Sequence, residues 1–281
     1  MARLQGAVGD DPATDPEPAA AFDPAEYWES RHELPGLAAV GHLRLGEPFN
    51  RWAYRARRRA FLRAVRPFLS DGPPARVLDV GSGKGFYVER WRELGARAVT
   101  GCDLSQGAVG ELRARFPESE FMQLDIGAPL DDDLAGRFDA VSAFDVVFHI
   151  VDDLAYRRAF ENAAKLLRPG GLLIFSEYLM EGRTRRAEAW VKRSRGEIEA
   201  AVHDAGLEEL SRRPMFFLMN PPAEAGLTLH RRAWRALAQA IRRHPRLGGV
   251  AGALLYPPEV ALTRFSSKGP STEIVVCRKP G

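Results

Sequence analysis

The stretch VLDVGSGKG, residues 77–85, joins a short apolar run to three closely spaced glycines and thereby restricts the fold. The apolar run predicts a buried strand, and GFYVERWREL directly after it predicts a helix. Glycine tolerates the backbone angles of a sharp turn, so Gly81, Gly83 and Gly85 allow a ligand to approach the backbone closely. The free N–H groups at the helix N-terminus face the same turn. We therefore expect a nucleotide-like ligand at this turn.

The spacing of these glycines limits which nucleotide can bind. It is G-x-G-x-G, which is neither the phosphate-cradling loop G-x-x-x-x-G-K-[ST] nor the full dinucleotide fingerprint G-x-G-x-x-G. Lys84 is followed by Gly85 instead of the Ser or Thr that would bind magnesium. The pattern argues against a nucleoside triphosphate and leaves NAD as an alternative.

Strand-like runs alternate with amphipathic helices through the middle of the chain. The expected strands are ARVLDV, ARAVTGCD, SEFMQLD, FDAVSAF, LLIFSEYL, LEELSRRPMFFLMN and PSTEIVVCRKP. Strands that alternate with helices imply right-handed crossovers and a ligand at the carboxyl ends of the strands. The sequence therefore predicts an α/β, doubly wound, mainly parallel seven-stranded sheet, with N-terminal helices and a helical insertion before the last strand.

The same patterns divide the chain into five expected segments. These are a disordered tail (1–22), an N-terminal helical cap (23–70), a Rossmann-like core (71–220), a helical insertion or lid (221–268) and the final strand of the core (269–281). The tail is rich in Ala, Pro and Asp, which is typical of disorder. Within the core, RRAEAWVKRSRGEIEAAVHDAG predicts one helix that ends at a glycine.

Acidic residues follow three successive expected strands. Asp79 precedes the glycines, where a carboxylate would repel a pyrophosphate and suit a positively charged amino group. Asp103 ends the next strand and can accept hydrogen bonds from both ribose hydroxyls. Asp125 follows a third strand and can meet an adenine amino group. A ligand with an amine, a ribose and an adenine but no phosphate is S-adenosylmethionine (SAM).

The chain resembles the class I SAM-dependent methyltransferases of small-molecule type. The matching stretches, in the order typical of that family, are VLDVGSGKG, VTGCDLS, MQLDIGAPL, FDAVSAFDVVFHI and LLRPGGLLIFSEYL, and they cover about residues 75–180. The helix EYWESRH resembles one that closes over SAM in many of these enzymes. The resemblance implies that SAM is the cofactor and S-adenosylhomocysteine the product. The cofactor-binding residues it implies are Asp79, Gly81, Ser82 and Gly83 at the methionine end, Asp103 at the ribose, Leu104, Asp125 and Ile126 at the adenine, Phe144 through its backbone, and Tyr27 and Arg31 from the N-terminal helix.

A hydroxyl acceptor needs a base, because a protonated alcohol is a poor nucleophile. His149 follows the fourth expected strand, where the acceptor should lie, and an ordinary histidine accepts a proton near neutral pH. Its alternative role is to line the pocket or cap a helix. Glu177, beyond the fifth strand, is the second catalytic candidate. Asp145, Asp152 and Glu177 have no recognisable metal-ligand spacing, so no metal is expected.

Composition restricts the partners and the location. The net charge is only +3, and no run approaches the roughly 20 apolar residues of a membrane span. Cys102 and Cys277 lie far apart and predict neither a disulfide nor a zinc site, which fits a cytoplasmic protein. The arginines of the second helix form either an anion-binding patch or a solvated face: Arg51, Arg55, Arg58, Arg59, Arg63 and Arg66. Nothing in the sequence specifies an oligomeric state.

Base-modifying amino-methyltransferases of similar fold carry [DN]-P-P-[YF] after the fourth strand, where this chain has AFDVVFH. The only comparable stretch, NPPA at residues 220–223, comes much later and predicts a turn, so a nucleic-acid substrate is disfavoured. The interpretation is a SAM-dependent methyltransferase that modifies a hydroxyl of a small molecule, such as a secondary metabolite or a sugar-containing compound. The alternatives are an N- or C-methyltransferase, an RNA methyltransferase, a SAM-binding protein that does not methylate, and an NAD enzyme.

Overall fold

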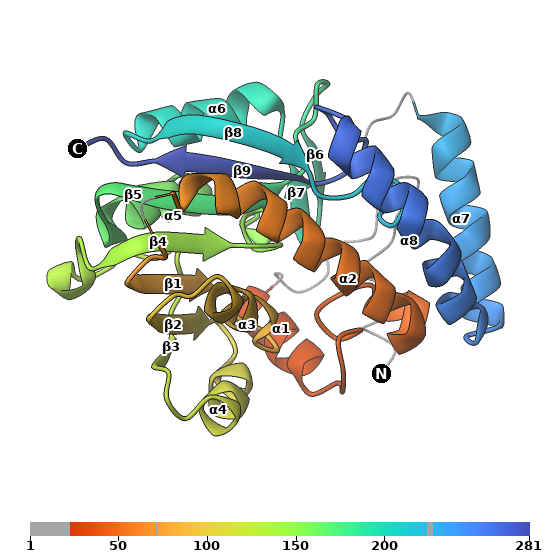
Figure 1. The fold of residues 1–281 in the computed structure, drawn as a ribbon, viewed down its shortest axis with the longest axis horizontal. Helices are drawn as coiled ribbons and strands as arrows, with labels where there is room; N and C mark the ends of the chain where they lie inside the picture. Colours follow the sequence, from red (N-terminus) through yellow and green to blue (C-terminus); the bar gives the residue numbers. More distant parts are fainter. Residues whose placement is uncertain (1–22, 71, 224–226) are drawn as a thin grey trace.

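The computed structural model describes residues 23–70, 72–223 and 227–281, which form a central sheet flanked by helices (Figure 1). The tail predicted for residues 1–22 lies outside the described residues. In the described part of the chain, the main sheet has seven strands in the order β3-β2-β1-β4-β5-β9-β8. Their bounds are β1 (Arg76–Val80), β2 (Ala98–Asp103), β3 (Phe121–Gln123), β4 (Phe138–Ala143), β5 (Leu167–Glu177), β8 (Glu208–Pro214) and β9 (Glu273–Arg278).

The strands from β3 to β5 pair in parallel, and β9 runs antiparallel to both of its neighbours. The chain leaves β1 toward β2 and β3, and then returns to place β4 on the other side of β1. This change of direction lies between β1 and β4, which is where open α/β sheets bind their ligands. The predicted fold class is confirmed, and the expected ligand turn lies at this switch point.

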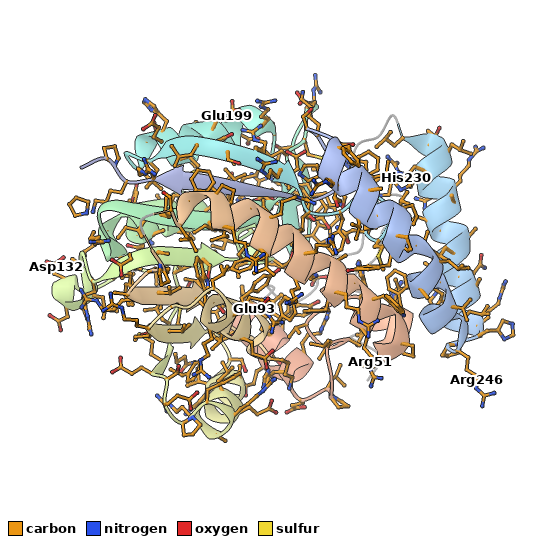
Figure 2. The ribbon with its side chains drawn as sticks, in the orientation of Figure 1. Arg51, Glu93, Asp132, Glu199, His230 and Arg246 are labelled. Atoms are coloured by element: carbon orange, nitrogen blue, oxygen red, sulfur yellow. The ribbon has the colours of Figure 1, made fainter. Side chains whose placement is uncertain are left out.

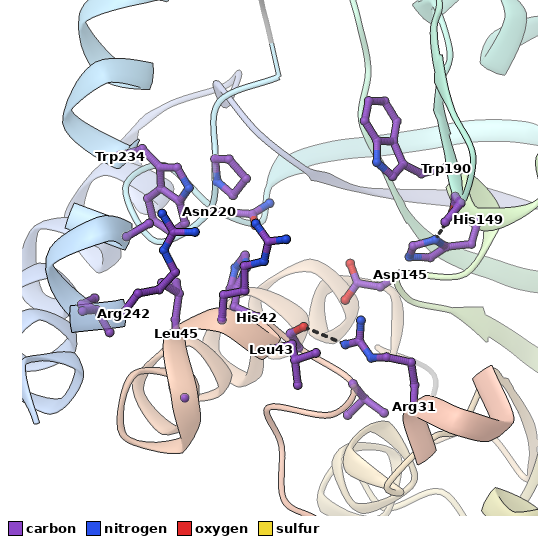
Figure 3. A pocket seen from close by; sticks show the side chains of 18 of the residues that line it. Arg31, His42, Leu43, Leu45, Asp145, His149, Trp190, Asn220, Trp234 and Arg242 are labelled. Atoms are coloured by element: carbon purple, nitrogen blue, oxygen red, sulfur yellow. Dashed lines mark hydrogen bonds between the residues drawn. The ribbon is translucent and has the colours of Figure 1, made fainter. Parts of the chain in front are cut away.

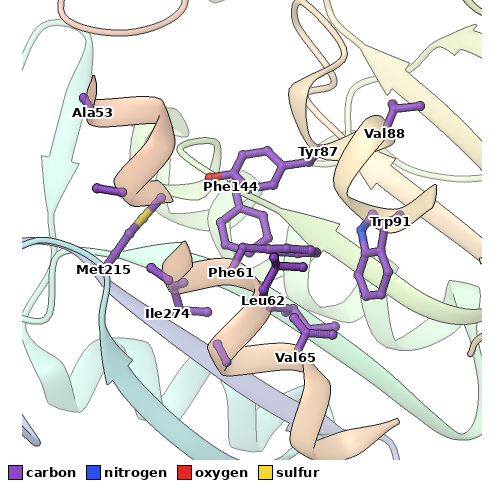
Figure 4. Packing of buried hydrophobic residues seen from close by; sticks show 14 of the residues in the cluster. Ala53, Phe61, Leu62, Val65, Tyr87, Val88, Trp91, Phe144, Met215 and Ile274 are labelled. Carbon is purple, nitrogen blue, oxygen red and sulfur yellow. The ribbon is translucent and has the colours of Figure 1, made fainter. Parts of the chain in front are cut away.

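Helices cover both faces of the sheet (Figure 1). One face carries α2 (Gly46–Val65), α3 (Phe86–Glu93) and α4 (Gln106–Arg115), and the other carries α5 (Asp153–Leu166) and α6 (Arg195–Asp204). The ring of Phe61 on α2 is fully buried, with its centroid 5.5 Å from Tyr87, 5.2 Å from Trp91 and 5.4 Å from Phe144 (Figure 4). Burial of such a ring contributes roughly 1.5–3 kcal/mol and fixes α2 against the sheet.

The arginines of α2 mostly extend into solvent or form hydrogen bonds with neighbouring elements. Arg51 points away from the body of the molecule, and 71% of its side chain is exposed (Figure 2). Arg58 donates to Glu93 at 2.9 Å, and Arg63 donates to the Pro214 carbonyl at 3.1 Å. Of the α2 arginines, Arg57 lines the cavity described below. Of the two alternatives that the sequence left open for these arginines, the contacts of Arg51, Arg58 and Arg63 favour the solvated face.

The single helix predicted for RRAEAWVKRSRGEIEAAVHDAG is wrong in its first half. Residues 185–192 form a hairpin of β6 (Arg185–Ala187) and β7 (Trp190–Lys192), and α6 begins only afterwards. Ser194 accepts from the Glu197 N–H, while the Glu197 carboxylate accepts from the Ser194 N–H at 2.9 Å. This reciprocal capping satisfies the first backbone groups of the helix and sets its start at this point.

The insertion consists of α7 (Thr228–Arg243) and α8 (Leu247–Phe265), which lie together at one end of the molecule (Figure 1). α8 packs along α2, so closely that a Cβ on Gly252 would lie 2.5 Å from Trp52. Glu259 on α8 is buried and accepts from the backbone N–H groups of residues 217–219 at 2.6–2.8 Å. These contacts fasten the insertion to the core. None of the helices in the described part of the chain has the length and apolar character needed to cross a bilayer.

Candidate active site

The Gly-rich turn joins β1 to α3 and is closed by its own hydrogen bonds. Ser82 donates its N–H to the Cys102 carbonyl at 3.0 Å and its hydroxyl to the Asp79 carbonyl at 2.9 Å. Gly81 has φ +67°, and a Cβ there would lie 2.3 Å from Val146. Only glycine fits this close approach of two loops. The Ser82 hydroxyl therefore serves the turn itself, and the turn adjoins the loop after β4.

Asp103 is held in a defined position at the end of β2. Its carboxylate accepts from the Gly83 N–H at 2.8 Å and from the Ser105 N–H at 3.0 Å. Burial raises the pKa of Asp103, whereas these two backbone donors act in the opposite direction. A carboxylate accepts up to about four hydrogen bonds, so acceptor capacity remains for a ligand.

Asp79 lies buried beneath the turn with one oxygen unsatisfied. Its Oδ1 accepts from the Ser142 hydroxyl at 2.7 Å, while Oδ2 has no hydrogen-bond partner in the described residues. Burial raises the pKa of Asp79 to about 7, although the Ser142 hydrogen bond lowers it. A buried carboxylate that lacks a donor favours a cationic ligand group, because a cation both pairs with it and satisfies it.

The remaining predicted cofactor residues lie at the ends of β2, β3 and β4. Asp125 is exposed and accepts from the Gly127 N–H at 2.8 Å, and the adjacent Ile126 is buried. Leu104 is half-buried beside Asp103. The Phe144 ring stacks on Tyr87 in the core, with centroids 4.1 Å apart, so only its backbone remains for a ligand.

The first helix, α1 (Pro24–His32), is fastened over this region. Glu29 accepts from the Gly107 N–H at 3.0 Å at the start of α4. Lys84 of the Gly-rich turn donates to the His32 carbonyl at 2.9 Å and to Glu111 at 2.8 Å. Arg31 donates to the Ala39 carbonyl at 2.8 Å and so holds the segment that follows the helix. α1 therefore closes one side of the predicted cofactor site.

A cavity of about 1180 Å³ adjoins this site (Figure 3). Its walls come from α1, residues 40–46, Arg57 of α2, the loop after β4, Tyr178 after β5, the β6–β7 hairpin, residues 220–221 and α7. Of the predicted site residues, Tyr27, Arg31 and His149 line it. The predicted residues of the strand ends do not: Asp79, Gly81, Ser82, Gly83, Asp103, Leu104, Asp125, Ile126, Phe144 and Glu177. The cavity adjoins the predicted cofactor site at Val40, which lines the cavity and lies against Gly83. A Cβ on Gly83 would lie 3.3 Å from the Val40 side chain.

His149 faces this cavity with a defined tautomer. Its Nδ1 lies 2.6 Å from the Ala189 carbonyl, and its ring contacts Trp28 edge-on with centroids 4.9 Å apart. Because a carbonyl oxygen only accepts, Nδ1 carries the proton in the neutral ring and Nε2 keeps its lone pair. Burial lowers the pKa of His149 to about 4. The ring is therefore neutral at physiological pH and presents an acceptor.

Asp145 is a site residue that the sequence pattern did not single out as such. It adopts φ +57°, a left-handed conformation that is rare outside glycine, and its N–H donates to the Ser176 hydroxyl at 2.7 Å. It forms an ion pair with Arg57, which is buried on α2. Both residues line the cavity, and Figure 3 shows Asp145 beside His149. The partners lie 88 positions apart in the chain, so no local signal reveals the pair.

Glu177, the second catalytic candidate, is enclosed in the core and does not line the cavity. It is fully buried, its Oε1 accepts from the Tyr178 N–H at 2.7 Å, and Tyr156 donates to Oε2 at 3.4 Å. Burial raises its pKa to about 8. The structure places Tyr178, rather than Glu177, on the cavity wall.

The sheet order, the Gly-rich turn at the switch point and the acidic strand ends agree with the fold that the sequence resemblance implied. Residues 77–171 match the family model described as a methyltransferase domain. The family predicted from the sequence is confirmed for this segment, which is the centre of the fold.

Two curated relatives are ubiquinone biosynthesis O-methyltransferases. The protein from Xanthomonas campestris pv. campestris is 43% identical over 108 residues, covering 37% of this chain and 43% of that protein. The protein from Dinoroseobacter shibae is 27% identical over 213 residues, covering 69% of this chain and 82% of that protein. The chain thus matches less than half the length of the Xanthomonas relative.

Two solved structures share the fold. The N-methyltransferase NodS from Bradyrhizobium japonicum, in complex with S-adenosylhomocysteine, has a TM-score of 0.53 at 16% identity, covering 92% of this chain and all of that chain. The 1,6-didemethyltoxoflavin-N1-methyltransferase from Burkholderia thailandensis has a TM-score of 0.54 at 19% identity, covering 95% and 94%. At these identities the likeness establishes the fold.

Proposed function

We propose that this protein is an enzyme that binds SAM and transfers its methyl group to a hydroxyl of a small molecule. The observation that carries the proposal is the unsatisfied oxygen of buried Asp79 beneath the Gly-rich turn. A carboxylate there repels the pyrophosphate of NAD and attracts the ammonium group of SAM. The methyltransferase domain and the names of the O-methyltransferase relatives support the same assignment.

In this proposal, each predicted residue takes the part of SAM nearest to it. Asp79, Gly81 and Gly83 receive the methionine end, and Asp103 receives the ribose hydroxyls. Leu104, Asp125 and Ile126 receive the adenine, and Phe144 contributes its backbone. α1 closes over the cofactor, with Tyr27 and Arg31 toward the cavity. The hydroxyl of Ser82 stays in the turn.

Bound SAM supplies an activated methyl group, so the protein mainly has to align the acceptor and exclude water. His149 accepts a hydrogen bond from the acceptor hydroxyl at Nε2 and takes its proton as the methyl group arrives. A base with a pKa of about 4 is weak, which favours an acidic hydroxyl such as a phenol over an alkyl alcohol. The Asp145 carboxylate lies beside the site and stabilises the imidazolium that forms.

Binding measurements test the cofactor assignment directly. Calorimetric titration with SAM and S-adenosylhomocysteine is expected to show binding, and titration with NAD is expected to show none. Asp103→Ala should weaken binding of both sulfur ligands by about tenfold or more, since it removes hydrogen bonds to a charged acceptor. Asp133→Ala, at an exposed aspartate of the short 3-10 helix Asp132–Leu134, is the matched control and should bind normally. Binding of NAD in place of the sulfur ligands would overturn the proposal.

Two finer points belong to this proposal. The cytoplasmic location expected from the cysteine content stays a prediction. The chemical class of the acceptor, a secondary metabolite or a sugar-containing compound, also stays a prediction. Loss of SAM binding without loss of folding in the Asp103→Ala variant would support the site as assigned, whatever the acceptor is.

A further inference from the structure

One side of α8 is buried, and the opposite side is exposed along the whole helix. The buried side faces α2 and the loop after β8, and it carries Gly248, Gly252, Glu259 and Thr263. The exposed side is apolar apart from Arg264. We call its apolar residues the α8 stripe: Leu247, Val250, Leu254, Pro257, Pro258, Ala261 and Phe265.

The α8 stripe is one continuous surface. Its residues follow one another at intervals of three or four positions, with a proline pair in the middle, and this spacing places them on one side of a helix. The side chains are well exposed, at 58% for Val250, 71% for Leu254 and 82% for Phe265. A continuous exposed apolar face of this kind is typical of a surface that contacts a partner.

The charge of the insertion is strongly positive. Residues 228–265 contain seven arginines and a single acidic residue, Glu259, although the whole chain has a net charge of only +3. Glu259 is buried and accepts hydrogen bonds from three backbone N–H groups, so it places no carboxylate on the surface. Arg231 and Arg235 of α7 have interactions elsewhere in the chain, so the charge that a partner meets comes from the other arginines.

Three exposed arginines lie at the two ends of the α8 stripe. Arg243 and Arg246 come just before Leu247, and Figure 2 shows Arg246 pointing away from the body of the molecule. Arg264 adjoins Phe265 at the other end. A second copy of the chain would bring the same positive charges against these arginines, whereas a surface of anionic groups attracts them. The charge therefore favours an anionic partner over a copy of this chain.

From the apolar stripe and its basic ends we propose that α8 binds the surface of a lipid bilayer that contains anionic lipids. The apolar side chains enter the boundary between headgroups and acyl chains, and the arginines contact the anionic headgroups. In this arrangement α8 lies in the plane of the membrane. The proposal depends on neither the cofactor nor the acceptor of the proposed function, so each can fail without the other.

Co-sedimentation of the full chain with lipid vesicles tests the proposal. One set of vesicles contains phosphatidylcholine alone, and the other contains phosphatidylcholine and phosphatidylserine in equal parts. We expect binding to the mixed vesicles, weaker binding to phosphatidylcholine, and a difference between the two that decreases as ionic strength rises. No binding to the mixed vesicles, or equal binding to both sets, would overturn the proposal.

A matched pair of leucine variants tests the α8 stripe. Leu254→Ser removes an apolar side chain from the stripe and should weaken binding to the mixed vesicles about fivefold or more. Leu154→Ser is the control, because Leu154 is 66% exposed on α5, on the other face of the sheet, and this variant should bind as the wild type does. Both side chains are exposed, so circular dichroism should show that both variants are folded. Equal binding by the two variants contradicts the proposal.

A pair of double variants tests the charge. Arg243→Gln with Arg246→Gln should weaken binding to the mixed vesicles about tenfold or more. Arg137→Gln with Arg157→Gln changes the net charge equally at exposed positions outside the insertion and should retain binding. An equal loss in both would show an effect of net charge alone and would count against the proposal.

Analytical ultracentrifugation without vesicles tests a second copy of the chain as the occupant of the α8 stripe. A dimer that Leu254→Ser dissociates would assign the stripe to self-association and overturn the membrane proposal. We expect no such dimer, because the arginines at the ends of the stripe would repel their copies.

Discussion

The carboxyl of Asp79 is only 1% exposed, and burial raises its pKa from 3.8 to about 7. The unfolded chain releases this proton near pH 3.8, while the folded protein retains it up to about pH 7. The stability gained from the bound proton is therefore full at low pH and is lost as the pH rises through about 7. At about 1.36 kcal/mol per pKa unit, the loss amounts to up to about 4 kcal/mol.

The variant Asp79→Asn should lack this dependence, because an amide does not ionise. Urea unfolding should show that Asp79→Asn gains stability relative to the wild type as the pH is raised. The same variant should bind SAM more weakly, since the carboxylate that pairs with the ammonium group is gone. If the stabilities of the wild type and Asp79→Asn change in parallel between pH 3.8 and about 7, burial does not raise the pKa of Asp79.

Burial shifts His149 in the opposite sense, lowering its pKa from 6.5 to about 4. The unfolded chain takes up a proton below pH 6.5 and the folded protein does not, so stability is full above pH 6.5 and falls as the pH falls toward 4. The expected loss is about 3 kcal/mol. In NMR spectra, the ring resonance that disappears in His149→Gln should stay constant through neutral pH and shift only near pH 4. A midpoint near 6.5 would show that the ring is solvated.

At the scale of elements, α1 depends on a few polar contacts to remain over the cofactor site. Glu29 supplies an acceptor for the first turn of α4, and its distance to the Gly107 N–H is 3.0 Å. Glu29→Ala should release this contact, increase amide hydrogen exchange throughout α1 and weaken SAM binding several-fold. Glu26→Ala, at an exposed position of the same helix, should change neither quantity. Faster exchange with unchanged SAM binding would show that α1 is not part of the cofactor site.

The sequence predicted most elements well where a local pattern set them. The strands β1, β2 and β4 are short apolar runs buried on both faces, so composition alone marks them. The hairpin β6–β7 escaped prediction, because its alternating residues also fit a helix and the start of α6 depends on the paired caps Ser194 and Glu197. The sequence motif S-x-x-E was visible there and marks the true helix start.

For the whole molecule, binding of SAM or S-adenosylhomocysteine should stabilise the fold, because the ligand contacts parts that are distant in sequence. The proposed site joins α1, the Gly-rich turn and three strand ends. These parts do not contact one another in the unfolded chain. A ligand at one hundred times its Kd adds about 2.7 kcal/mol to the unfolding free energy. The Tm should therefore rise by several degrees with S-adenosylhomocysteine and not with NAD. Equal Tm values without ligand, with S-adenosylhomocysteine and with NAD would contradict the proposed cofactor site.

The sequence by itself determined the sheet, the Gly-rich turn and the acidic strand ends Asp79, Asp103 and Asp125, because each follows from a strand or turn signal within a few residues. Only the tertiary structure decided that Arg57 pairs with Asp145, that Trp28 packs edge-on against His149 and that α7 lines the cavity. These contacts join segments far apart in the chain. Their energies come from burial and pairing across the folded core, which no local pattern encodes.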